Sequence, residues 1–256
     1  VVYEESSFQT GQVRVGECLR EGLALVRGHY WLLVGMSLMA LVFVSVPVVL
    51  YAPALCGLAW CGIKLHRGDE IRFDDFFRGF DHFNQGILVA LLHMGVVLAV
   101  NMVLALPFLI LMFGSVVGLG ASTPAGGEPS AAGALGFFGL MVVAEVGWVL
   151  AMIPALAVVR VFLYFAYPLL VIRRLPAMAA VKLSCRAGKA NFWPLLGLHL
   201  LISLAMGVGA MCCYAGFVFV PPVALGVLTV AFRRIFPVQP PPLPDDNPAA
   251  ATPTGA

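Results

Sequence analysis

The sequence predicts an all-α fold, a polytopic transmembrane helix bundle with six spans. The spans form three helical hairpins, each preceded by an amphipathic interfacial helix. Composition is the first observation behind this prediction. Hydrophobic residues make up 61% of the chain and charged residues 11%, whereas soluble globular chains have roughly 45–50% and 25%. Because too few polar residues are present to cover a water-soluble surface, an ordinary soluble enzyme, a nucleic-acid binder and a disordered chain are excluded.

Long runs without charge locate the expected spans. Residues 28–63, 82–127 and 190–232 contain no Asp, Glu, Lys or Arg over 36, 46 and 43 residues. Since one transmembrane helix needs roughly 20 apolar residues, the first and third runs are each long enough for a hairpin. Both runs also contain residues that favour a turn, namely Pro47, Pro53, Gly216, Pro221 and Pro222.

The middle hairpin is longer than a membrane requires. Apolar segments 85–119 and 134–172 flank a loop rich in Gly, Ser, Pro and Ala at 120–133. Each segment would exceed about 50 Å as a helix, against a hydrocarbon core of roughly 30 Å. We expect each to be a spanning helix with an extra piece on the loop side, broken near Pro107 and Pro154. The extra pieces could project outward, lie in the interface or return as half-helices.

Basic residues predict the orientation of the spans. Of the 15 Lys and Arg residues, 14 fall in four groups before, between and after the hairpins, and the outer turns carry none. Because Lys and Arg near helix ends favour the cytoplasmic side, both termini are expected in the cytoplasm. The expected spans lie near residues 30–49, 52–66, 84–106, 149–172, 192–215 and 221–236.

Amphipathic stretches at 13–27, 71–83 and 176–189 precede the three hairpins. They predict helices that lie in the cytoplasmic interface or, alternatively, pack on the cytoplasmic end of the bundle. The junctions RGHYWLLVG and KANFWPLLG share a frame of basic, aromatic, Trp and Gly residues, which predicts repeat units within one transmembrane domain, residues 1–236. These units cover about 12–66, 71–172 and 176–236, and a disordered Pro/Ala-rich tail with seven prolines follows at 237–256.

Arg160 is the leading candidate for a functional residue, because a charge inside a membrane is costly. Glu145 lies 15 residues earlier, about 22 Å away along a straight helix, so the two cannot pair directly. Asn101, His93 and His199 are the candidate partners of Arg160 on a substrate or ion path. The alternative for Arg160 is one structural interhelical hydrogen bond or snorkelling, and for the other three a satisfied packing contact.

Two further groups are candidates for contact with lipid headgroups. Lys182, Arg186 and Lys189 form the basic face of the third amphipathic stretch, and Trp31 and Trp193 open the spans that follow two of these stretches. Basic residues approach anionic headgroups, and Trp anchors helices at headgroup level.

No metal, cofactor or catalytic site is expected. Asp69, Glu70, Asp74 and Asp75 are interleaved with arginines and match no calcium loop, so they are interpreted as a solvated loop and a helix start held by Asp74. The six cysteines form no ligand cluster and are interpreted as packing residues, with a bridge from Cys56 to Cys212 or Cys213 as an alternative. No nucleophile, zinc-protease or phosphate-loop motif is found.

The segment PALCGLAWCGIKLHRGDEIRFDDFFRGFDHF (53–83) carries the pattern F-x-D-x-F-x-G-F at Phe73, Asp75, Phe77, Gly79 and Phe80. It resembles a pattern in bacterial polytopic membrane families of unknown function. The segment 167–193 resembles the second loop of those families, with its A-x-K-x-S at Ala180, Lys182 and Ser184. The families are also similar to the membrane domain attached to some glycerophosphodiester phosphodiesterases. The resemblance implies a six-span protein of the bacterial inner membrane, and no catalytic residues.

Two functions are expected from these patterns. The first is a non-enzymatic scaffold, assembly or accessory module, favoured by sparse polarity in the spans and by the Pro-rich tail. The alternative is a transporter or lipid-handling protein with a path near Arg160, favoured by the repeats and the broken middle helices. An intramembrane enzyme ranks third. Membrane lipids are the expected partners, together with a protein partner or a second copy of the chain, and no nucleic acid.

Overall fold

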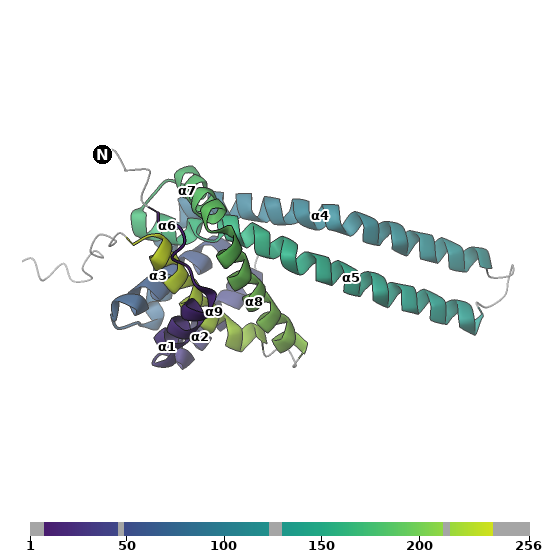
Figure 1. Ribbon diagram of the computed structural model, residues 1–256, viewed down its shortest axis with the longest axis horizontal. Coiled ribbons are helices and arrows are strands. Elements are labelled where there is room, and N and C mark those ends of the chain that lie inside the picture. The colour runs from purple at the N-terminus through teal and green to yellow at the C-terminus, as the bar shows by residue number, and fades with distance from the viewer. Residues whose placement is uncertain (1–7, 46–48, 123–129, 212–215, 238–256) are drawn as a thin grey trace, which may run out of the picture.

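The computed structural model describes residues 8–45, 49–122, 130–211 and 216–237. Every secondary-structure element in these ranges is a helix, so the all-α prediction is confirmed for this part of the chain. The helices are α1 (Val15–Arg27), α2 (Tyr30–Ser45), α3 (Tyr51–Arg67), the 3-10 helix η1 (Phe73–His82), α4 (Phe83–Ser122), α5 (Ala131–Leu163), α6 (Ala166–Arg173), α7 (Ala177–Ala190), α8 (Phe192–Met211) and α9 (Gly216–Ile235). Figure 1 shows α4 and α5 running side by side out of the bundle that the other helices form.

Several helices are long and apolar enough to cross a membrane, which supports a multi-pass membrane protein. There are four in the described residues: Phe73–Gly118, Ala131–Arg173, Phe192–Ala210 and Gly216–Ile235. A fifth arises if α1 and α2, bent by 99° at their junction, form one broken span. The helix α3 has 17 residues and carries Lys64 and Arg67 in its last turn, so it measures only about 26 Å. By length and composition, the described helices therefore provide four or five of the six spans that the sequence predicted.

The prolines do not break the helices where the sequence predicted. Pro107 lies inside the 40-residue α4 and Pro154 inside the 33-residue α5, so the prediction of breaks there is wrong. Pro221 and Pro222 likewise lie inside α9, after its start at Gly216. Proline is tolerated in membrane helices because neighbouring helices and local adjustment satisfy the freed backbone groups. The extra pieces therefore continue the two helices and project from the bundle.

We call this projection the arm, defined as residues 98–122 of α4 and 131–147 of α5. At about 1.5 Å per residue, α4 is about 60 Å long and α5 about 50 Å. Large apolar side chains on the arm are exposed, among them Ile110 at 70%, Phe113 at 73% and Leu135 at 74%. The arm is therefore an apolar pair of helices with little protein around it.

The second amphipathic stretch is a 3-10 helix, η1, where an α-helix over 71–83 was expected. Its inward positions Phe73, Phe76 and Gly79 recur every third residue, which is the 3-10 period, and Phe76 is fully buried. A Cβ at Gly79 would overlap the carbonyl oxygen of Pro53 in α3. The tighter helix thus lets the backbones of η1 and α3 touch.

The core surrounds the short helix α6. Residues 166–171 are all buried, and Phe165 just before them packs edge-on against Phe236 after the end of α9. The amphipathic helix α1 lies against α9, where Gly22 and Gly226 allow close contact of the two backbones. The core therefore lies at the end of the molecule opposite the arm.

The cysteines and the tail can be placed only in part. Cys18, Cys56 and Cys61 are buried and Cys185 is half-buried, all four with free thiols. The predicted alternative partners of Cys56, Cys212 and Cys213, lie outside the described residues. The predicted tail does so from residue 238 onward.

Candidate functional site

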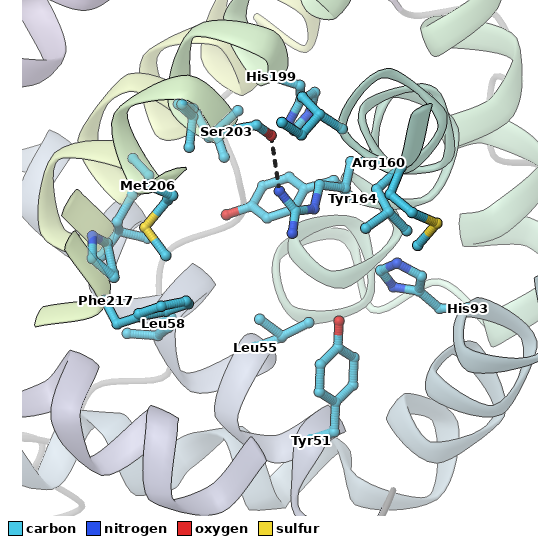
Figure 2. Close-up of a pocket in the computed structure, with 18 of the residues that line it drawn as sticks. Tyr51, Leu55, Leu58, His93, Arg160, Tyr164, His199, Ser203, Met206 and Phe217 are labelled. Atoms are coloured by element: carbon cyan, nitrogen blue, oxygen red, sulfur yellow. Dashed lines mark hydrogen bonds between the residues drawn. The ribbon is translucent and has the colours of Figure 1, made fainter. Parts of the chain in front are cut away.

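A cavity of about 540 Å³ is lined by residues of α3, α4, α5, α8 and α9 (Figure 2). Its volume falls within the range of about 300–1,000 Å³ that is typical of ligand pockets. Its walls are mostly aliphatic and aromatic: Leu55, Leu58, Trp148, Val149, Met152, Ile153, Leu156, Ile202, Met206, Phe217, Pro221, Ala224, Leu225 and Leu228. Its polar side chains are Tyr51, His93, Arg160, Tyr164, His199 and Ser203.

Helical periodicity explains how α5 and α8 line this cavity. On α5 the positions 148, 152, 156 and 160 follow one another at intervals of four, which places them on one helix face, and Tyr164 at the C-cap continues the series. On α8, His199 and Ser203 are also four residues apart, and Met206 follows three later. One face of each helix therefore lines the cavity.

Arg160 carries the only positive charge among the described residues that line the cavity. Figure 2 shows its guanidinium in the middle of the cavity, with a hydrogen bond from Nη1 to Ser203 Oγ of 3.4 Å. This is longer than the 2.7–3.2 Å of a strong N–H···O bond, and no carboxylate is found among the lining residues that the structure describes. The cation therefore has one weak neutral partner and no counterion in the described cavity.

Two ring nitrogens at the cavity are also unsatisfied. Trp148 Nε1 and His199 Nε2 are buried and have no hydrogen-bond partner among the described residues. The Trp148 nitrogen is a donor only, whereas His199 Nε2 donates or accepts according to the tautomer. A buried polar group without a partner costs roughly 1–3 kcal/mol, so a ligand that accepts hydrogen bonds would be stabilised here.

His93 and Tyr51 form the opposite wall of the cavity. Nδ1 of His93 lies 3.1 Å from the hydroxyl of Tyr167 on α6, and the ring of Tyr51 packs edge-on against both residues. In Figure 2 the Tyr51 hydroxyl points toward the middle of the cavity. His93 thus has a structural partner, while Tyr51 adds a hydroxyl that faces the guanidinium.

Of the candidates on a path, the structure brings Arg160, His93 and His199 together around one cavity. Asn101 is half-buried on α4 and Glu145 is exposed on the arm, and neither lines the cavity. The sequence reasoning missed Trp148, Ser203 and Tyr51. The first two could have been found by helical spacing, since Trp148 precedes Arg160 by twelve residues on one face and Ser203 follows His199 by four.

The candidates for headgroup contact lie at the surface. Lys182, Arg186 and Lys189 are exposed on α7. Trp31 and Trp193, near the starts of α2 and α8, are 75% and 78% exposed, which is unusual for the largest apolar side chain. These positions suit residues at the level of lipid headgroups.

The acidic loop has a structural role at one residue. Asp75 is buried and pairs with Lys64, whereas Asp69, Glu70 and Asp74 are exposed. Asp75 Oδ2 accepts a hydrogen bond from the Arg72 backbone nitrogen at 2.7 Å. The start of η1 is therefore held by Asp75, and the prediction that Asp74 holds it is wrong.

Comparison of the chain with protein-family models, curated proteins and solved structures finds no match. A guanidinium and unsatisfied ring nitrogens at an apolar cavity can bind an anionic group attached to an apolar body.

Proposed function

We propose that this protein is an integral membrane protein that binds an anionic amphiphile, the lipid-handling alternative of the two expected functions. The observation that carries the proposal is the Arg160 guanidinium in an apolar cavity of about 540 Å³ with no carboxylate among its described lining residues. A fixed positive charge in such surroundings favours a mobile anion.

The ligand chemistry follows from the two parts of the cavity. Arg binds carboxylate or phosphate through two parallel hydrogen bonds, and Trp148 Nε1 offers a third donor. The aliphatic walls from α5, α8 and α9 suit an acyl chain. A fatty acid or a phospholipid satisfies both requirements, whereas a small inorganic anion satisfies only the first.

The proposal includes six spans in a bacterial cytoplasmic membrane, with both termini in the cytoplasm. Four long apolar helices, and α2 as the apolar helix of the bent pair, support several of the crossings. The sixth would be α3, whose last turn carries Lys64 and Arg67, as the cytoplasmic end of a span does. The bacterial assignment and the absence of catalysis rest on the resemblance described above and on the lack of catalytic motifs.

A scaffold or assembly function is the second candidate, and the arm favours it. A helix of about 60 Å would need a tilt of about 60° to fit a hydrocarbon core of roughly 30 Å, beyond the usual 0–40°. Part of the exposed apolar surface of α4 and α5 therefore lies beyond the hydrocarbon if the helices stand upright. Such a surface would be covered by a protein partner or a second copy.

A binding titration tests the lipid-handling proposal. The purified full chain is titrated with dansyl-labelled undecanoic acid, and energy transfer from the tryptophans, Trp148 among them, reports binding. Arg160→Gln should weaken binding about tenfold or more, since a hydrogen bond to a charged group is worth roughly 1.5–3 kcal/mol. Arg160→Lys should retain part of the affinity.

Arg20→Gln is the matched control, because Arg20 is exposed on α1. Equal affinity of Arg160→Gln and Arg20→Gln would refute the lipid-handling proposal and leave the scaffold as the better candidate.

A further inference from the structure

A second pocket, with lining residues different from those of the Arg160 cavity, lies at the junction of α3, η1, α4 and α6. Its volume is about 360 Å³ and it shares no lining residue with the Arg160 cavity. Polar side chains dominate its residues: Trp60, Arg78, Asp81, His82, Gln85 and Arg174, with Leu170, Val171 and Leu175 as the apolar part. Its charged residues lie on η1 and at the end of α6, in the two segments that the distribution of basic residues places in the cytoplasm, so it would open at the inner surface of the membrane.

The charges of this pocket favour an anion. Arg78 and Arg174 contribute two guanidinium groups, and Asp81 is the one carboxylate among the described lining residues. The Arg78 guanidinium lies over the ring of Trp60, with Cζ 5.8 Å from the ring centroid. This cation–π contact holds the Arg78 guanidinium against a wall of the pocket, where its charge adds to that of Arg174.

Two neutral donors reinforce this preference. Trp60 Nε1 is buried and has no hydrogen-bond partner among the described residues. Gln85 Oε1 accepts a hydrogen bond of 2.9 Å from the backbone nitrogen of Ala177, which is the first residue of α7. Because the oxygen of this amide is thereby used, its NH₂ group is the part that remains for a ligand. The pocket thus combines guanidinium, indole and amide donors.

The backbone at Arg174 is held in an uncommon conformation. Arg174 has φ 50° and ψ 35°, in the left-handed region, and is the one non-glycine residue with positive φ in the described part of the chain. This region is unfavourable for a long side chain, and such positions persist where the surroundings fix them, often at binding sites. The conformation places Arg174 at the end of α6, where the chain turns into α7.

We propose that this pocket binds a phosphate group at the cytoplasmic surface. The Arg174 fork, an indole N–H and an amide match the tetrahedral oxygens of phosphate, and basic pockets between membrane helices on this side suit phospholipid headgroups. An anionic phospholipid of the inner leaflet and free phosphate share this chemistry, and the experiment distinguishes them. The proposal is independent of the Arg160 cavity.

Trp60 reports on the pocket directly. The full chain, purified in a nonionic detergent with Trp31, Trp148 and Trp193 replaced by Phe, has Trp60 as its single tryptophan. Its emission is followed during titration with dioctanoyl phosphatidylglycerol, inorganic phosphate, or dioctanoyl glycerol, which lacks phosphate. If the Trp60 emission saturates at a lower concentration of phosphatidylglycerol than of inorganic phosphate, the ligand is a phospholipid headgroup. If both saturate it at the same concentration, the ligand is free phosphate. No response to the phosphate compounds, or an equal response to dioctanoyl glycerol, overturns the proposal.

Arg174→Asn tests the assignment of residues, because Asn tolerates the left-handed backbone and should preserve the fold. The affinity should fall about tenfold, the loss of a hydrogen bond to a charged group. Lys182→Asn on the exposed face of α7 is the matched control and should bind as the parent does. Arg160→Gln should also leave the Trp60 response unchanged, which separates this proposal from the lipid-handling proposal. Unchanged binding in Arg174→Asn overturns it.

Discussion

Lys64 and Asp75 form a largely buried ion pair between α3 and η1, with Nζ 2.9 Å from Oδ1 and 3.0 Å from Oδ2. The side chains are 15% and 7% exposed. Asp75 Oδ2 also accepts the hydrogen bond from the Arg72 backbone nitrogen. One carboxylate thus fixes both the start of η1 and its position on α3.

Removal of the Asp75 carboxylate should be strongly destabilising. We expect Asp75→Ala to cost about 3–5 kcal/mol, since it leaves the Lys64 charge buried without a partner. Asp75→Asn should cost less, because its amide oxygen can still accept from the Arg72 nitrogen. Thermal unfolding in detergent measures both. Asp74→Asn, at an exposed position, should change stability by no more than about 0.5 kcal/mol, and a loss as large as that of Asp75→Ala would contradict this account.

Contact of the backbones at Gly79 should make that position intolerant of a side chain. A Cβ there would overlap the carbonyl of Pro53 and crowd the backbone of Gly57. We expect Gly79→Ala to destabilise the protein by about 1–3 kcal/mol or more. Gly95→Ala is the control, because nothing lies within 4 Å of a Cβ at that position of α4, and Ala favours a helix by about 1 kcal/mol. Equal melting temperatures for the two variants would show that α3 and η1 do not touch in this way.

Acid should loosen the attachment of α1 to the end of α9. Arg234 Nη1 donates to Glu17 Oε2 at 2.8 Å and Nη2 to Glu21 Oε1 at 2.7 Å. The Arg234 hydrogen bond, followed by that of Arg14, holds the pKa of Glu17 below its ordinary value. A lowered pKa in the folded state means that this stabilisation is complete above the unfolded pKa, about 4.3, and is lost as the pH falls through the folded pKa.

Hydrogen exchange of α1 measures this effect. Protection of α1 in the wild type should decrease below about pH 4, whereas Glu17→Gln should already be less protected at neutral pH and should change less on acidification. The remaining change in that variant belongs to Glu21, which also pairs with Arg234. An identical pH profile in Glu17→Gln and wild type would exclude Glu17 as the titrating group.

The two ends of the bundle should be accessible from opposite sides of the membrane. Ser130 is exposed and caps the start of α5, where its side chain accepts from the Gly133 nitrogen, and Lys182 is exposed on α7. In a background without native cysteines, Ser130→Cys should react with an impermeant maleimide added to intact cells. Lys182→Cys should react only after the membrane is opened. Labelling of both from one side would contradict the proposed orientation.

Local patterns of the sequence located the helices well, whereas the environment decided their breaks and their packing. The amphipathic segments at 13–27 and 176–189 correspond closely to α1 and α7, because periodicity is visible in a single sequence. The effect of Pro107 and Pro154 was misjudged, since the cost of proline depends on which neighbours satisfy the freed carbonyl. The 3-10 geometry of η1 depends on contact with Gly57, which no local pattern reveals.

The candidate site was also predictable only where a local sequence pattern reveals its residues. Arg160 stands out because it is a charge within an apolar segment. The convergence of His93 and His199 on the same cavity depends on how α4 and α8 pack against α5, which is a tertiary property. Trp148 and Ser203 share helix faces with predicted residues, so helical spacing alone would have added them.

Photoaffinity labelling tests the central claim most directly. The full chain in vesicles is irradiated with a photoactivatable palmitic acid, and the modified peptides are identified by mass spectrometry. We expect labelling of α5 and α8 around the cavity residues Trp148, Met152 and Met206, which excess palmitate and Arg160→Gln both abolish. Labelling confined to the exposed arm, and equal in wild type and Arg160→Gln, would contradict the claim that this cavity binds an anionic amphiphile.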